Sequence, residues 1–240
     1  MLRRALLLFI ESLIAMPALA GSLSITPVRV ELSNAQRSVA LTVRNDGDQP
    51  SVVQAQLVAW SQESNEDKLD PTVDLLASPP IFTVAPGASQ ILRVALRRAP
   101  DSAVERTYRI LVNEVPGKPQ PGFTGAQFAL KISLPIFVDA MTGKTAPNIE
   151  WSAKLAPTGD IALTLANTGS RHLQVHSAEV LNDQSTVDAA ISSMFYVLPG
   201  QRRTMSMKPI EGRTPAAGRY KVRAESDAGP LSADVVVDPR

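Results

Sequence analysis

The chain has 240 residues, 44% of them hydrophobic and 20% charged, which is the composition of a folded globular protein of one or two domains. Its formal net charge of +1 provides no overall field that would attract nucleic acid or an anionic membrane surface. Because the chain contains no cysteine, disulfides, thiolate metal sites and cysteine nucleophiles are excluded, and packing alone must hold the fold.

The first twenty residues have the pattern of a secretory signal peptide. Arg3 and Arg4 form a positively charged start, an apolar run follows, and a small-x-small cleavage pattern ends at Ala20. The apolar run is shorter than the ~20 residues needed to span a bilayer, so cleavage is favoured over retention as an anchor. We therefore expect residues 1–20 to be removed on export, which leaves a mature chain without a membrane-inserted segment.

From residue 22 to residue 138, apolar and polar residues alternate with a period of two, which predicts β-strands. The expected strands lie at residues 22–32, 39–43, 52–60, 81–84, 91–96, 107–115 and 128–138. Turn signals such as Pro86-Gly87 separate them, and the polar, charged stretch 61–70 is expected to be a loop. About seven strands at this spacing indicate an immunoglobulin-like β-sandwich, which we assign to residues 21–140.

The pattern restarts after a small polar linker at residues 139–147. A second set of strands is expected at residues 151–155, 161–165, 173–180, 195–198, 204–207, 219–224 and 231–237. This half also has the size of one sandwich, and we assign it to residues 141–240. The predicted fold class is therefore all-β, with two immunoglobulin-like β-sandwich domains.

One apolar row in residues 127–138 is longer than a small sandwich usually needs. Phe128, Leu130, Ile132, Leu134, Ile136 and Val138 all have the same parity. Alternate residues of a strand share a face, so this row would extend over ~35 Å. Two interpretations stay open at this point: an ordinary core strand, or an edge strand that adds to the sheet of a partner.

Two arginines, Arg29 and Arg109, lie inside expected apolar strands. A guanidinium is costly to bury without a partner. Each arginine therefore either occupies an exposed edge or an internal ion pair, or it forms a site for a carboxylate ligand, which arginine can bind through two hydrogen bonds.

Several segments of the first half, taken together, carry a resemblance. They are Ile25-Thr26-Pro27-Val28-Arg29, Asn45 before a turn, Trp60, the stretch 80–87 with Gln90 and Arg93, Tyr108-Arg109-Ile110, Asn113-Glu114-Val115-Pro116 and Lys131-Ile132-Ser133-Leu134-Pro135. In this order they resemble the periplasmic pilus-assembly chaperones of the bacterial chaperone–usher pathway. The resemblance covers nearly all of the first domain, whereas the second domain matches only in size and strand content.

The resemblance implies a periplasmic, non-catalytic protein whose two domains form an L or boomerang. Such a chaperone binds pilus subunits (pilins) whose own sandwich lacks a strand, and completes them by donor-strand complementation. It then delivers them to an outer-membrane usher. No cofactor is implied, and self-association of the free protein through its apolar strand is an open alternative.

The resemblance also implies site residues. The donor strand would be Phe128, Leu130 and Ile132, and the anchor for the subunit's C-terminal carboxylate, in the cleft between the domains, would be Arg29, Arg109 and Lys131. The family's usual anchor lysine follows the isoleucine of an Ile-Lys-Leu unit, but Ser133 stands at that position here. This departure points to an archaic-type member, in which Arg109 is the stronger anchor and the donor register is shifted.

Other classes of protein fit less well. The two histidines, His172 and His176, would lie ~13 Å apart on a strand and are expected at the surface, so we expect no metal site. No nucleophile turn, phosphate loop or paired-carboxylate motif is present, which argues against an enzyme. A structural pilin usually has a single incomplete sandwich. A secreted carbohydrate- or peptide-binding module stays an alternative, although an aromatic content of 5% is low for sugar stacking.

Overall fold

The computed structural model describes residues 23–117, 129–141 and 145–239, so the expected signal peptide and Phe128 lie outside the described residues. Every regular element in the described part of the chain is a β-strand, which confirms the predicted all-β class. Within the same residues, no helix has the length and apolar character needed to cross a membrane.

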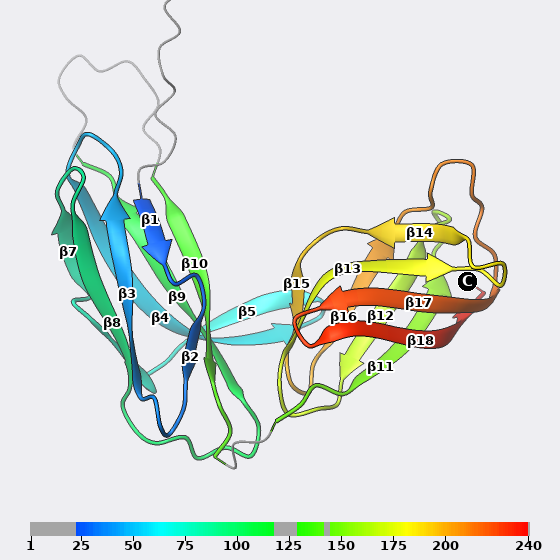
Figure 1. Cartoon of the computed structure of the whole chain (residues 1–240), viewed down its shortest axis with the longest axis horizontal. Coiled ribbons are helices and arrows are strands. Elements are labelled where there is room, and N and C mark those ends of the chain that lie inside the picture. The colour runs from blue at the N-terminus through cyan, green and yellow to red at the C-terminus, as the bar shows by residue number, and fades with distance from the viewer. Residues whose placement is uncertain (1–22, 118–128, 142–144, 240) are drawn as a thin grey trace, which may run out of the picture.

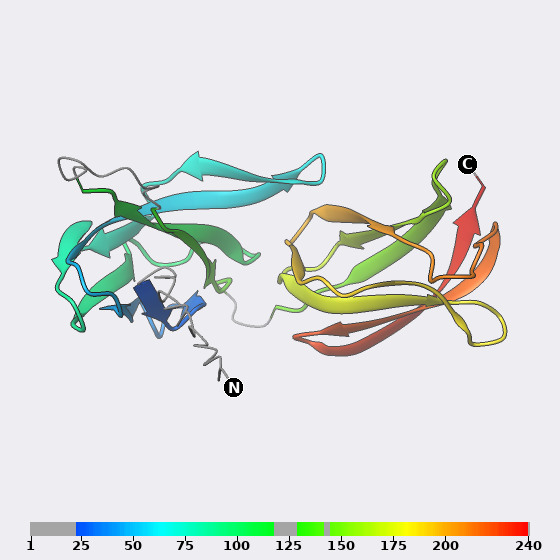
Figure 2. The same cartoon turned by 90° about the horizontal axis from the view of Figure 1, so that it is seen from above.

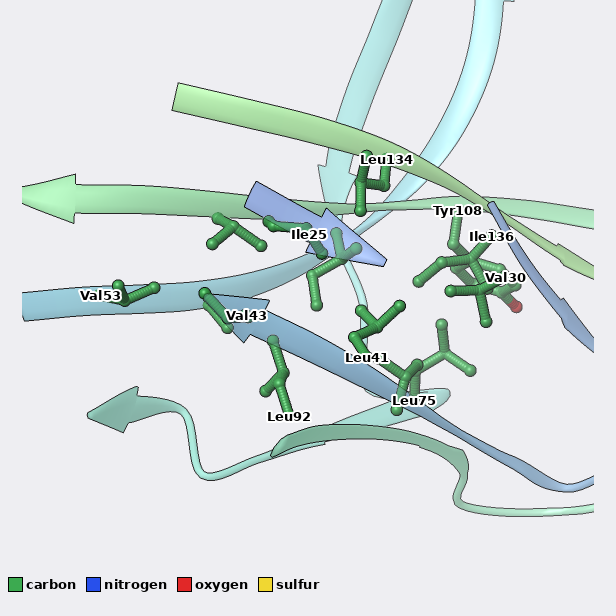
Figure 3. Close-up of a cluster of buried hydrophobic side chains, with 14 of the residues drawn as sticks. Ile25, Val30, Leu41, Val43, Val53, Leu75, Leu92, Tyr108, Leu134 and Ile136 are labelled. Atoms are coloured by element: carbon green, nitrogen blue, oxygen red, sulfur yellow. The ribbon is translucent and has the colours of Figure 1, made fainter. Parts of the chain in front are cut away.

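Ten strands form the first sandwich. They are β1 (Leu23–Thr26), β2 (Val30–Leu32), β3 (Ser38–Asn45), β4 (Ser51–Glu63), β5 (Glu66–Pro71), β6 (Leu75–Ser78), β7 (Ile81–Val84), β8 (Ser89–Leu96), β9 (Arg106–Val115) and β10 (Lys131–Val138). One sheet has the order β1-β3-β8-β6, and the other has the order β2-β10-β9-β4-β5, with β7 paired to β4. Alternate residues of both sheets meet in a core that includes Leu41, Leu92 and Ile110. Figure 3 shows this core between the two sheets.

Eight strands form the second sandwich. They are β11 (Ile149–Leu155), β12 (Ile161–Asn167), β13 (Leu173–Leu181), β14 (Val187–Ile191), β15 (Phe195–Val197), β16 (Arg202–Met207), β17 (Gly218–Ser226) and β18 (Gly229–Asp238). They follow the path β14-β13-β17-β18-β11-β12-β16, with β15 paired to β13. This path curves around a core that contains Leu163, Leu165 and Val222, so the strands form a second sandwich. Figures 1 and 2 show the two sandwiches as separate lobes set at an angle.

The structure differs from the predicted elements in three respects. Residues 22–32 do not form one strand, because β1 pairs with β3 whereas β2 pairs with β10 in the opposite sheet. The expected loop at 61–70 is instead a hairpin of β4 and β5, paired from Val58–Pro71 to Glu63–Glu66. This hairpin projects beyond its own sandwich toward the second lobe (Figure 1), so it needs no apolar alternation. The strands β6 and β14 were not predicted either.

A small aromatic cluster joins the two lobes. Trp60 near the end of β4, Phe137 of β10 and Leu198 after β15 are buried together, and Tyr196 packs against them. The ring centroids of Trp60 and Tyr196 lie 5.4 Å apart in an edge-to-face arrangement. The amide of Gln62 donates to the Tyr196 carbonyl at 2.9 Å and accepts from the Leu198 N–H at 3.1 Å. These contacts between distant parts of the sequence fix the lobes to each other.

Candidate functional site

The apolar row of β10 changes character along the strand. Leu134 and Ile136 are buried in the first core, whereas Leu130 and Ile132 are only half-buried at its rim. The row is therefore one continuous stripe whose first part is still accessible. The structure thus places Leu130 and Ile132 of the predicted donor strand on the core side of the sheet.

The outer edge of β10 is paired over only part of its length. On one side β10 pairs with β9 from Lys131 to Val138, but on the other side β2 pairs only with residues 136–138. No other strand in the described residues pairs with this side of Lys131–Pro135. We call Lys131–Pro135 the open edge and Ile136–Val138 the sealed end.

The hydrogen-bond pattern shows which groups the open edge presents. The Glu114 N–H donates to the Leu130 carbonyl at 2.8 Å, and the Asp139 N–H donates to Leu32 at 2.9 Å. By the alternation of an antiparallel ladder, even residues of β10 then bond to β9 and odd residues face outward. The outward groups of the open edge are therefore the N–H and carbonyl of Lys131 and Ser133, and Pro135, which has no N–H, ends this series where the pairing with β2 begins.

Arg109 lies opposite Pro135 on β9, on the face of the sheet that points toward the second lobe. Its guanidinium stacks 3.8 Å from the ring centroid of Trp60, and its Nη1 donates to the Ser133 hydroxyl at 3.2 Å. Its Nη2 lies 3.4 Å from a carboxylate oxygen of Asp67 on β5. The arginine is thus oriented by an aromatic surface and loosely paired.

The charge around Arg109 favours an anion. Burial lowers the pKa of Arg109, the positive charge of Arg203 lowers it further, and Asp67 opposes both. Arg203, on β16 of the second lobe, contacts the other oxygen of Asp67 at 3.2 Å. Two guanidinium groups, one from each lobe, therefore converge on a single carboxylate.

Arg29 has a different environment, between β1 and β2. It pairs with Glu31 at 2.9 Å and, across the lobes, with Asp227 at 3.2 Å. Its Nη2 also lies 3.0 Å from Nε2 of His172. A pocket of about 460 Å³ opens beside these groups. Arg29 is therefore occupied by internal partners.

Lys131, the third predicted anchor residue, begins β10 and is exposed. It lies opposite Asn113, two residues before the Ser133 hydroxyl that Arg109 contacts. The structure therefore puts Lys131 on the same face of the sheet as Arg109. No contact joins Arg29 to either residue within the described parts of the chain.

The prediction that His172 lies at the surface is wrong. His172 is 2% exposed and stacks on Phe137 with 3.5 Å between ring centroids. Its Nδ1 lies 2.7 Å from Glu105, and its backbone N–H donates to the same carboxylate. His176 is exposed, as predicted. A lone histidine in a strand pattern gives no signal of these partners, because they come from the other lobe.

The buried network around His172 shifts two pKa values. Burial alone would lower the pKa of His172, but hydrogen bonds to Asp227 and Glu105 raise it above its ordinary value. Burial would raise the pKa of Asp227, but hydrogen bonds from His172 and from the Gln174 backbone lower it to about 2. Both pKa shifts favour protonated His172 beside ionised Asp227. In the described residues no group of acidic and histidine side chains could hold a metal ion.

Comparison with known proteins gives the chain a family. Residues 22–140 match the family model of the pili and flagellar-assembly chaperones, PapD N-terminal domain. The chain therefore belongs to the family of pilus-assembly chaperones, which confirms the resemblance seen in the sequence.

Individual relatives agree. The chain is 24% identical to the chaperone protein PapD of Escherichia coli over 160 residues, which is 65% of this chain and 64% of that protein. It is 29% identical to the chaperone protein FimB/FhaD of Bordetella pertussis over 128 residues, which is 50% of this chain and 52% of that protein. The aligned regions thus span between half and two thirds of these relatives.

Solved structures share the fold. The chaperone–tip subunit complex CsuC–CsuE from the archaic Csu pili of Acinetobacter baumannii matches with a TM-score of 0.66 and 19% identity, over 92% of this chain and 100% of that one. The SafA pilin–SafB chaperone complex of Salmonella enterica matches with a TM-score of 0.62 and 18% identity, over 89% and 96%. These matches confirm the predicted fold of two immunoglobulin-like domains.

Proposed function

We propose that this protein is a periplasmic chaperone that binds pilus subunits and stabilises them by adding a strand to their incomplete sheet. The observation that carries the proposal is the open edge of β10. Its outward main-chain groups can pair with a subunit strand, and the half-buried Leu130 and Ile132 can enter an apolar groove of the subunit. Burial of apolar surface there stabilises the complex by ~25 cal/mol per Å².

The subunit's C-terminal carboxylate is anchored, in this proposal, by Arg109. A subunit strand that runs parallel to β10 ends beside Pro135, and Arg109 lies directly opposite Pro135. The stacked guanidinium offers paired N–H donors that suit a carboxylate. Lys131 contributes a more distant positive charge. Arg29 does not bind the carboxylate directly, because its donors already have internal partners, and it contributes by holding the junction of the lobes.

The remaining parts of the proposal follow from the family. The exported chaperone works in the periplasm and passes its subunit to an outer-membrane usher. Ser133 in place of the family's usual lysine, together with the likeness to a chaperone of archaic pili, supports membership of the archaic branch. Phe128, the third donor-strand residue that the resemblance implies, lies outside the described residues.

The open edge is tested with Leu130→Asp, which puts a charge into the apolar row at an accessible rim position. We expect the variant to fold but to retain less than about a tenth of the subunit, because a buried unpaired carboxylate is costly. Tagged protein is expressed with the small secreted proteins encoded nearby, and the co-eluting species are identified by mass spectrometry.

The matched control is Ile91→Asp on β8, in the opposite sheet. Ile91 is 43% exposed and belongs to neither the open edge nor the cleft, so this variant should retain the subunit. A normal yield of complex from Leu130→Asp would contradict strand addition through β10. A wild-type protein that binds a glycan or peptide ligand and no pilin would favour the alternative of a secreted binding module.

A further inference from the structure

The ion pair between Asp67 and two arginines has a feature that a structural salt bridge does not need. Asp67 lies in the β4–β5 hairpin, and each of its oxygens faces a different lobe, Arg109 at 3.4 Å and Arg203 at 3.2 Å. Gln62 also donates to it at 3.2 Å. All three contacts are longer than the 2.7–2.9 Å of a well-formed charge-assisted hydrogen bond, so the carboxylate is held loosely.

The Asp67 carboxylate lies beside Arg109, where the carboxylate of a bound subunit would lie in the proposed complex. Arg109 is stacked on Trp60 and touches Ser133 of the open edge, so its orientation does not depend on Asp67. Asp67 itself keeps 34% of its side chain exposed. An anion arriving along β10 can therefore take the place of Asp67 without any change in the fold.

The same site includes a residue from the second lobe. Arg203 lies on β16, its side chain is 24% exposed, and its guanidinium reaches the same carboxylate as Arg109. The β4–β5 hairpin remains docked beside it through the Thr204 N–H, which donates to the Asn65 side chain at 2.8 Å. The hairpin thus keeps its place when the Asp67 side chain turns away.

We propose that Asp67 is an internal substitute for a subunit's terminal carboxylate, held between Arg109 and Arg203 in the free protein and displaced when the subunit binds. The inference rests on the proposed function, because it assigns a regulatory role to the anchor of the same site. In the free chaperone Asp67 then compensates one of the two positive charges in the cleft, and a chain end binds there only when it displaces Asp67. Arg203 becomes part of the carboxylate site.

The test uses two synthetic peptides of alternating valine and threonine with solubilising N-terminal lysines, one ending in a free carboxylate and the other in an amide. Binding to the full-length mature protein is measured by titration calorimetry. The wild-type protein should bind the acid more tightly than the amide. The ratio of the two affinities isolates the carboxylate site from strand pairing.

Asp67→Asn removes the competing charge and keeps the shape. We expect it to raise the acid-to-amide ratio about fivefold, the size of one partly exposed ion pair. Asp67→Glu, which reaches further into the site, should lower the ratio, and Arg203→Gln should lower it as well. Asp70→Asn, an exposed carboxylate on the same strand with no ion pair among the described residues, is the matched control and should leave the ratio unchanged.

The outcomes separate this inference from the proposed function. If both peptides bind and Asp67→Asn leaves the ratio unchanged or lowers it, Asp67 is not a competitor and the inference fails while strand addition stands. If acid and amide bind equally to every variant, there is no carboxylate site at Arg109 and the inference fails with the anchor. If neither peptide binds to the wild-type protein, strand addition fails and the inference fails with it.

Discussion

The two ends of β10 belong to one strand and one apolar row, yet they have opposite surroundings. At the sealed end, Ile136 is fully buried, and Phe137 lies on the other face between Trp60 and His172. At the other end, Ile132 of the open edge and Leu130 just before it lie at the rim, and the outer main chain of the open edge has no partner strand in the described residues. The comparison shows that one strand can hold a domain together at one end and present a binding surface at the other.

The largest difference between the ends should appear in stability. Ile136→Ala removes a side chain with no exposed surface and should lower the free energy of unfolding by about 2–5 kcal/mol. Leu130→Ala, at the rim, should lower it by about 1 kcal/mol or less. Urea unfolding followed by circular dichroism measures both.

Subunit retention should show the reverse order for these two variants. Leu130→Ala weakens the complex, whereas folded Ile136→Ala protein still binds. Equal losses of stability at both positions would show that the open edge is as firmly packed as the sealed end, and the contrast would be lost.

A smaller difference in subunit binding should separate Arg109 from the other two basic residues, Lys131 and Arg29. Arg109→Ala should weaken subunit binding by roughly 10- to 100-fold, the worth of hydrogen bonds to a charged group, with little change in stability. Lys131→Ala should weaken binding less, because Lys131 lies further from the carboxylate.

Arg29→Ala should act mainly on the fold. It leaves Asp227 and His172 without a shared partner and should lower the unfolding free energy by about 1–2 kcal/mol. Binding titrations and urea unfolding on the same preparations separate the effects. A loss of binding with Arg29→Ala as large as that with Arg109→Ala would place the anchor at the sealed end.

The smallest effect is a pH dependence of the sealed end. Burial and the positive charge of Arg29 lower the pKa of His172, but the hydrogen bonds to Asp227 and Glu105 outweigh them and raise it above 6.5 in the folded protein. Its stabilising contribution is complete below pH 6.5 and is lost as the pH rises through the raised value. The contribution of Asp227, whose pKa is lowered to about 2, is constant in this range, since it is lost only in acid.

The melting temperature should therefore fall between pH 6 and pH 9 in the wild-type protein. His172→Gln should flatten this part of the profile, and His176→Gln, at the exposed histidine, should preserve it. A slope that survives in His172→Gln would assign the effect to another group.

The sequence was enough to predict the fold because each sandwich is made of strands with one buried face, and burial of one face leaves a period of two. It was enough to single out β10 for the same reason. Arg29 and Arg109 could be found because a charge within an apolar strand breaks that period.

The partners of these residues could not be predicted. Asp67 lies 42 positions from Arg109, and Asp227 lies 198 positions from Arg29. The sequence predicts a loop at residues 61–70 instead of the end of the β4–β5 hairpin, because the side chains of β5 are exposed throughout and carry no apolar alternation. His172 was placed at the surface because its burial depends on Phe137 and Glu105, which only the docking of the two lobes brings to it.

Pro135 makes the two ends of the open edge unequal in hydrogen bonding. Beyond Ser133, a partner strand meets a residue whose nitrogen carries no hydrogen, and after it β2 already occupies the edge. Pro135 therefore limits the number of main-chain hydrogen bonds that can form between β10 and a bound subunit strand. These hydrogen bonds are fewest near the chain end of the bound strand. Detachment would begin there, so the lifetime of the complex depends on the contact at the guest's terminus more than on the length of the paired strand.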